Sequence, residues 1–199
     1  MSPSLNDDVL EHLASYLEEG QLSVAIAQVE DALAKTEPTP FHALRGVSLL
    51  PQCEAGLRWL DAFYDRVSQA QPVKALYLEM NGFDVNTDEW YVDGFAFEQV
   101  GDPGELDWLA DWKEDMTTTD PFVLRGFEAG QEAFAQYMEE EELSDALERA
   151  RDLAEALVVL RLQELLDHIH RAAKSQGLAW GQTPMWVTAH DYELVHISK

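Results

Sequence analysis

The chain has 199 residues, with 13 Lys and Arg against 38 Asp and Glu, which gives a formal net charge of −25. Hydrophobic residues make up 46% of the chain, far too many for a disordered acidic protein, and the negative charge opposes binding to DNA, RNA or anionic lipid. The sequence contains no apolar stretch of about 18 residues that predicts a membrane span, and residues 1–13 lack the pattern of a secretory signal. We therefore expect a cytoplasmic protein of bacterial type, without direct nucleic-acid or membrane binding and with its oligomeric state left open.

Two amphipathic helices are predicted at the N-terminus. Apolar residues recur at helical spacing over residues 5–17 and again over residues 22–33, and Gly20 is placed to end the first helix. The short gap between the two patterns predicts an antiparallel helical hairpin over residues 5–35. Pro38 follows the second pattern and is expected to end it.

The middle of the chain changes from helical to extended periodicity. A third helix is predicted after Pro51, with its apolar positions facing inward. Residues 73–80 are rich in strand formers and apolar on both faces, which is typical of a central strand. Residues 90–100 predict a second strand, with a bulge or bend at Asp93 and Gly94.

Two further helices are predicted after the second strand. Residues 104–115 carry leucines and tryptophans at helical spacing, which predicts a short helix. Asp120 is a favourable N-cap residue and Pro121 suits the first helical position, so another helix is expected to begin there.

The C-terminal part of the chain predicts one long helix followed by strand. Residues 143–174 have a helical pattern that would span about 48 Å, so we expect a break or kink, and Gly177 is expected to end the helix. Residues 185–197 predict one long strand or a hairpin that turns at His190 and Asp191. The sequence therefore predicts a single α+β domain over residues 1–199, with a small, mainly antiparallel sheet of three to four strands covered by about six helices.

Residues 84–88 contain the pattern most similar to a metal site. Asp84, Asn86 and Asp88 alternate as the oxygen ligands of calcium loops do. Such a loop also needs glycine at its sixth position and glutamate at its twelfth, where this chain has Glu89 and Phe95. We therefore expect an ordinary Asx-rich connection and no bound metal.

The residues typical of catalysis do not form a recognisable set. Asp167 and His170 have the spacing of half a di-metal carboxylate site, but the sequence has no second half. His168 lies two residues from His170 and would face another side of a helix. Cys53 is the only cysteine, and the sequence has neither a nucleophile elbow nor a glycine-rich phosphate loop. We assign no catalytic residue and no cofactor, with the enzyme class left open.

Acidic residues are concentrated in one segment. Residues 79–120 hold 13 acidic residues and one basic residue, Lys113, which gives a net charge of −12. In the predicted helix, Trp108 and Trp112 would lie one turn apart beside a stripe of carboxylates, a surface suited to Arg or Lys. Alternatively, both tryptophans belong to the core and the stripe is solvated. The predicted binding residues are Asp84, Asp88, Glu89, Asp107, Trp108, Asp111, Trp112 and Glu114.

Three segments carry a resemblance to known proteins: Leu76-Tyr77-Leu78-Glu79, residues 90–98, and His190-Asp191-Tyr192-Glu193. They resemble parts of small acidic α+β bacterial proteins of unknown function, some of which are immunity proteins that neutralise a toxin. Together with the charge, this predicts a non-enzymatic acidic binding protein that engages a basic protein partner, as an inhibitor or immunity protein. Two alternatives stay open: an enzyme whose cleft the sequence does not reveal, and a protein adapted to high salt, in which lysine is scarce.

Overall fold

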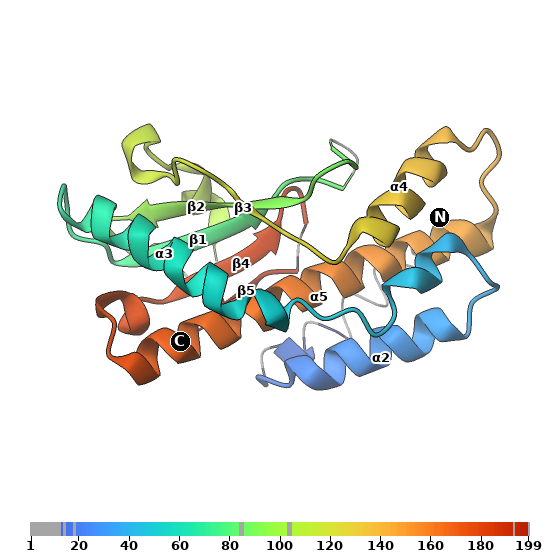
Figure 1. Cartoon of the computed structure of the whole chain (residues 1–199), viewed down its shortest axis with the longest axis horizontal. Coiled ribbons are helices and arrows are strands. Elements are labelled where there is room, and N and C mark those ends of the chain that lie inside the picture. The colour runs from blue at the N-terminus through green and yellow to red at the C-terminus, as the bar shows by residue number, and fades with distance from the viewer. Residues whose placement is uncertain are drawn as a thin grey trace.

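The computed structural model describes residues 13, 15–17, 19–83, 86–102, 105–192 and 194–198 (Figure 1). The α-helices with complete bounds are α2 (Leu22–Ala34), α3 (Cys53–Ser68), α4 (Glu128–Glu139) and α5 (Asp145–Gln176). The strands are β1 (Ala75–Met80), β2 (Tyr91–Phe97), β3 (Phe122–Val123), β4 (Met185–Ala189) and β5 (His196–Ser198). Short segments of 3₁₀ helix are η1 (Pro40–Leu44), η2 (Leu50–Gln52), η3 (Leu106–Ala110), η4 (Glu114–Met116) and η5 (Ala179–Gln182). The predicted α+β class is confirmed.

The five strands form one mixed sheet in the order β3-β2-β1-β4-β5. Three neighbouring pairs are antiparallel, and the central pair, β1 and β4, is parallel. A parallel pair needs a long crossover, which the chain supplies through α4 and α5. The prediction of a central strand over residues 73–80 is confirmed. The predicted counts of strands and helices were wrong, because the sheet has five strands and is accompanied by five α-helices. The count of helices includes the helical residues 13 and 15–17. The C-terminal strands form a hairpin, in which Asp191 adopts a φ of 56°.

Helix α5 is the longest element of the described chain, and it packs against α2 near the N-terminus and against β4 and β5 near the C-terminus. The Ser144 hydroxyl accepts a hydrogen bond from the Leu147 N–H at 3.2 Å, and Gly177 ends the helix with a φ of 71°. The helix is continuous over 32 residues, so the predicted break was wrong. Its middle is buried nearly all round because α2, α3 and the sheet pack against it. Within this contact, the buried Gln163 amide donates to the carbonyl oxygens of Val187 at 3.2 Å and Leu194 at 2.8 Å.

The N-terminal hairpin is described only in part. Residues 5–12 of the predicted first helix lie outside the described residues. Leu13 and Leu17 are buried in the same apolar cluster as the inward side chains of α2, and Gly20 adopts a φ of 70° in the turn between them. Among the described residues, no helix combines the length and apolar character needed to cross a membrane.

The two faces of the sheet have different coverings. Helices α3 and α5 pack on one face, and residues 105–112, drawn in yellow-green, run over the other face (Figure 1). Along β1, Leu76, Leu78 and Met80 contribute to the helix-side core, while Tyr77 and the neighbouring Glu79 belong to the opposite face. Because the covering segment is short and irregular, part of this second face stays open.

The segment that crosses the open face differs from the prediction. Residues 104–115 do not form one helix; the described part of this range contains η3 and the start of η4, two separate 3₁₀ turns. Its aspartates are poor helix formers, and Trp108 and Leu109 pack onto the sheet instead of along a helix. The helix predicted to begin at Asp120 and Pro121 was also wrong, because residues 122–123 form β3 and α4 begins at Glu128. Pro121 directly precedes β3, an edge strand of the sheet, where proline is tolerated.

Candidate functional site

The open face of the sheet contains a hollow of about 800 Å³, which we call the sheet-face hollow. It lies between the ends of β1, β2 and β4 and the η3 segment. Its aromatic lining residues are Tyr77, Phe95, Trp112 and Tyr192, and its titratable acidic and imidazole groups are Glu79, Asp107, Asp191 and His190. Among the described residues, no Lys or Arg lines it. The hollow therefore combines aromatic surface with negative charge.

Two carboxylates face each other on the floor of this region. Glu79 of β1 and Asp93 of β2 are directly opposite in the antiparallel register. Asp93 lines a smaller adjoining hollow of about 250 Å³, which shares Glu79, Phe95 and His190 with the sheet-face hollow. Like charges directly opposite each other destabilise a sheet, so this pair has an energetic cost to the fold.

Glu79 is held in place by two neighbours. His190 Nδ1 lies 2.5 Å from Glu79 Oε1. Burial, the charge of Glu79 and a hydrogen bond to Glu79 raise the pKa of Tyr77 well above its ordinary value, so the phenol keeps its proton and donates a hydrogen bond to this carboxylate. The side chain of Glu79 is 20% exposed, which leaves its carboxylate accessible from the hollow.

Asp93 has an environment that disfavours its charge. Burial and the nearby charge of Glu79 raise the pKa of Asp93, and a hydrogen bond from the Thr118 hydroxyl opposes this rise. The Thr118 Oγ1 donates to Asp93 Oδ1 at 3.3 Å. The two floor carboxylates thus repel each other, and a cation placed between them would relieve that repulsion.

Aromatic rings form one wall of the hollow. The rings of Tyr77 and Phe95 stack with centroids 5.6 Å apart, and Phe95 lies 5.4 Å from the ring of Trp112. Trp112 is 49% exposed, the most exposed tryptophan among the described residues. Ring faces beside carboxylates attract cations by electrostatics with the aromatic quadrupole.

The predicted binding residues of the 107–114 segment separate into different surroundings. Asp107 and Trp112 line the sheet-face hollow. Asp111 lines a different pocket, and Glu114 is exposed in η4 and lines neither. The prediction of one carboxylate stripe along a helix was wrong, because the segment is not one helix and Asp107 and Asp111 line different pockets.

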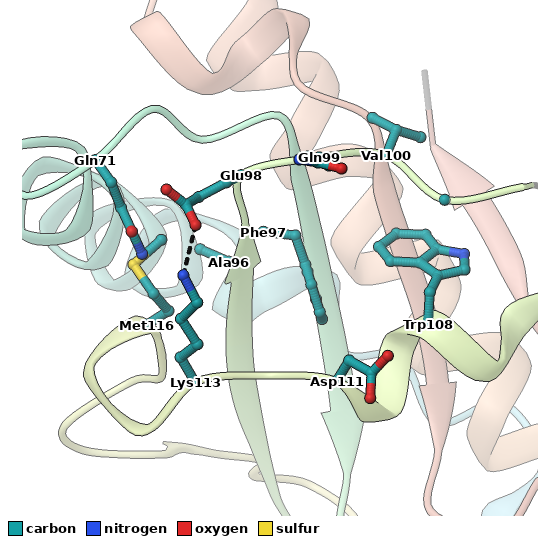
Figure 2. A pocket seen from close by; sticks show the side chains of 11 residues that line it. Gln71, Ala96, Phe97, Glu98, Gln99, Val100, Trp108, Asp111, Lys113 and Met116 are labelled. Atoms are coloured by element: carbon teal, nitrogen blue, oxygen red, sulfur yellow. Dashed lines mark hydrogen bonds and ion pairs between the residues drawn. The ribbon is translucent and has the colours of Figure 1, made fainter.

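Trp108 packs against different rings from those that Trp112 contacts. Its ring packs edge-on against Phe97 at 5.0 Å and against Trp186 at 5.1 Å, as part of the apolar layer on this face of the sheet. Figure 2 shows the adjacent pocket of about 280 Å³, in which Trp108 and the Lys113–Glu98 ion pair, 2.5 Å long, lie on opposite sides of Phe97. The single basic residue of the acidic segment is therefore neutralised within this pocket.

The remaining predicted residues lie in the connection between β1 and β2. Asp84 lies outside the described residues. The side-chain oxygen of Asn86 accepts hydrogen bonds from the backbone N–H groups of Asp88 at 3.0 Å and Glu89 at 3.3 Å, as in an Asx turn. Glu89 lies 3.6 Å from Arg125, and none of the described residues of this connection lines the sheet-face hollow.

Sequence reasoning missed several residues of the hollow. Tyr77 and Glu79, like Asp93 and Phe95, are two positions apart and so share a face of their strand. That alternation was visible in the sequence and could have placed each pair on one face. The cross-strand register that brings the two pairs together, and the position of His190 beside them, come only from the structure.

A second polar cluster lies under β5. The Ser198 hydroxyl donates to Asp167 at 2.8 Å, and His170 Nδ1 lies 2.8 Å from the same hydroxyl. The serine lies between the acid and the imidazole, whereas a nucleophilic triad requires the imidazole between the other two. Burial raises the pKa of Asp167, but the bonds from His196 and Ser198 and the charge of Arg171 outweigh burial and leave it below its ordinary value. This buried cluster fixes β5 to α5.

Neither cluster forms a metal centre. Among the residues that the structure describes, no group of three His, Cys, Asp or Glu side chains is placed to hold a metal ion. Asp167 and His170, whose spacing resembles half of a di-metal site, both contact the Ser198 hydroxyl. The chain matches no protein-family model, no curated protein and no solved structure, so the geometry of the hollow itself is the basis for assigning a function.

Proposed function

We propose that this chain is a non-enzymatic acidic binding protein that engages a basic protein partner through the open face of its sheet. The observation that carries the proposal is that, within the described chain, the carboxylates of the sheet-face hollow pair with no Lys or Arg. The imidazole of His190 lies beside both Glu79 and Asp191, and among the described residues Asp107 forms no ion pair. A basic surface would supply the missing positive charge.

The helical side of the molecule shows the contrasting arrangement. Arg161 of α5 binds Glu30 of α2 at 2.9 Å and Glu164 at 2.8 Å. Arg171 binds Asp167 at 2.7 Å, and other basic residues pair along the helices in the same way. Much of the small basic complement of the chain is thus used in ion pairs with acidic residues of the helices, which leaves the sheet face negative.

Such a surface acts first on the rate of encounter. A strongly acidic face steers a basic protein into contact and raises the association rate, with a marked dependence on ionic strength. In an inhibitor or immunity protein, the same contact would cover the cationic surface with which a nuclease-like toxin binds phosphates. The net charge of −25 itself disfavours any contact with the nucleic acid.

Two charge-matched triple variants test the proposal. The first replaces Asp107, Asp111 and Glu114 by serine, and the control replaces residues 140–142, three exposed glutamates, by serine. The control site lies between α4 and α5, at the opposite end of the molecule from η3 (Figure 1). Association rates with cytochrome c, a small basic protein, are measured by stopped flow at low and high KCl.

The proposal predicts that the first variant associates more slowly and with a weaker salt dependence, while the control changes little. Equal slowing in both variants would show that only total charge matters and would overturn the proposal. If the acidity serves salt adaptation instead, the free energy of unfolding would rise steeply with KCl and both variants would lose that rise equally.

A further inference from the structure

We propose that the sheet-face hollow anchors one arginine side chain of the basic partner, with the guanidinium between the aromatic wall and two carboxylates: Glu79, which lines this hollow, and its cross-strand partner Asp93, which lines the adjoining smaller hollow. This inference rests on the proposed function and names the group that the acidic face recognises. The hollow of about 800 Å³ is large enough for an arginine side chain together with neighbouring partner residues.

The floor carboxylates, which lie where the two hollows adjoin, have an unbalanced charge. Glu79 and Asp93 are cross-strand partners, an arrangement that costs stability in a sheet. Among the described residues, no Lys or Arg side chain forms an ion pair with either carboxylate; the imidazole of His190 lies beside Glu79, and Asp93 accepts a hydrogen bond from the Thr118 hydroxyl. Such conflicts between local stability and sequence are expected at functional sites. A bound cation would convert this repulsion into attraction.

The Glu79 carboxylate is oriented before any ligand arrives. His190 Nδ1 at 2.5 Å and the phenol of Tyr77 fix its position, so little side-chain entropy is lost on binding. Burial of the Glu79 side chain to 20% exposure also weakens competition from solvent. Pre-oriented carboxylates of this kind form strong, charge-assisted hydrogen bonds with cationic donors.

The wall of the hollow distinguishes arginine from lysine. Phe95 contacts both Tyr77 and Trp112, and the ring of Trp112 is 49% exposed. A planar guanidinium can stack on such a ring while its fork of N–H groups reaches two carboxylates. The ammonium group of lysine is a compact, strongly hydrated charge without this planar fork, so it gains less from this geometry.

The test uses calorimetric titration with blocked peptides of four arginines, four lysines or four citrullines. Citrulline keeps the shape of arginine without its charge. The proteins are the unaltered chain, the variant Glu79→Gln with Asp93→Asn, the variant Trp112→Ala, and a control with Glu140→Gln and Glu141→Gln. The control removes the same two charges from exposed positions, and melting temperatures confirm that each variant is folded.

The inference predicts that the unaltered chain binds the arginine peptide and not the citrulline peptide. Changing both floor carboxylates should weaken this binding about tenfold or more, Trp112→Ala should weaken it severalfold, and the control should change it less than about twofold. If the floor variant does not fold, Trp112→Ala alone decides, because this exposed ring is not part of the core.

Each of the other possible binding results identifies which claim is wrong. Equal loss in the floor variant and the control would overturn the arginine site while leaving the acidic surface in place. Equal affinity for the lysine and arginine peptides would overturn the assignment of arginine. If the unaltered chain does not bind the arginine peptide at low salt, this inference fails, whereas the proposed function is decided separately by the association rates with cytochrome c.

Discussion

The substitution Asp93→Asn should stabilise the protein at neutral pH, although it removes a charged group from the centre of the sheet. The asparagine side chain would keep the shape of the aspartate and an oxygen that accepts the Thr118 hydrogen bond, now 3.3 Å long. It would remove the repulsion from Glu79, the direct cross-strand partner of this position. Cross-strand charge effects amount to about 0.2–1 kcal/mol, and for a chain of this size 1 kcal/mol corresponds to a shift of roughly 2–4 °C in melting temperature.

The pH dependence of this effect has a definite sign. Burial and the charge of Glu79 raise the pKa of Asp93 above its value in the unfolded chain, so the folded state binds this proton more readily. The destabilisation from Asp93 is therefore full above its folded pKa and declines as the pH falls toward the unfolded value of 3.8. The advantage of Asp93→Asn should decline over the same acidic window.

Urea denaturation at a series of pH values, from neutral to acidic, measures both the stabilisation by Asp93→Asn and its dependence on pH. The control Asp88→Asn removes the same charge from an exposed position and should change the free energy of unfolding by less than about 0.5 kcal/mol. A loss of stability with Asp93→Asn at neutral pH, or a gain equal to that of the control, would refute the claim that the floor carboxylates repel each other.

Three further predictions follow from the packing. Trp108→Ala should lower the free energy of unfolding by about 3 kcal/mol, because its ring packs against the sheet, whereas Trp112→Ala should cost less than about 1 kcal/mol; urea midpoints that reverse this order would contradict the placement of the two rings. Ser198→Ala should cost about 1–3 kcal/mol by leaving buried groups of Asp167 and its neighbours unsatisfied, and a neutral result in thermal melts would remove the structural role of that cluster. Cys53 should react with iodoacetamide more slowly than a free thiol at pH 8, because burial raises its pKa, and Cys53→Ala should cost at most about 2 kcal/mol; rapid alkylation would contradict this.

Local chemistry was sufficient to predict some of the regular elements, among them α5 and β1. Helix α5 begins after Ser144 and ends before Gly177, and both ends are determined by capping interactions that depend on a few neighbouring residues. The continuous apolar run of residues 75–78 predicted a strand buried on both faces, and β1 is the central strand of the sheet. In both cases, the residues that determine the structure are close in the sequence.

The acidic segment could not be predicted in the same way. Trp108 and Trp112 have helical spacing, but contacts with Trp186 and Phe95 from distant strands decide their positions. The candidate site depends on the register between β1 and β2, and on a turn at His190 that follows residue 79 by 111 positions. Composition identified the sign of the charge, whereas tertiary pairing determines which carboxylates face one another.

The six tryptophans provide the most direct test of the arginine site. In a spectrum of the ¹⁵N-labelled protein, each indole N–H gives a separate signal, assigned by single Trp→Phe variants. Titration with the tetra-arginine peptide should shift the Trp112 signal strongly, with saturation, while Trp90 and Trp180, both fully buried in the helix-side core, stay unchanged. An unchanged Trp112 signal at peptide concentrations that saturate calorimetric binding would contradict the claim that arginine occupies the sheet-face hollow.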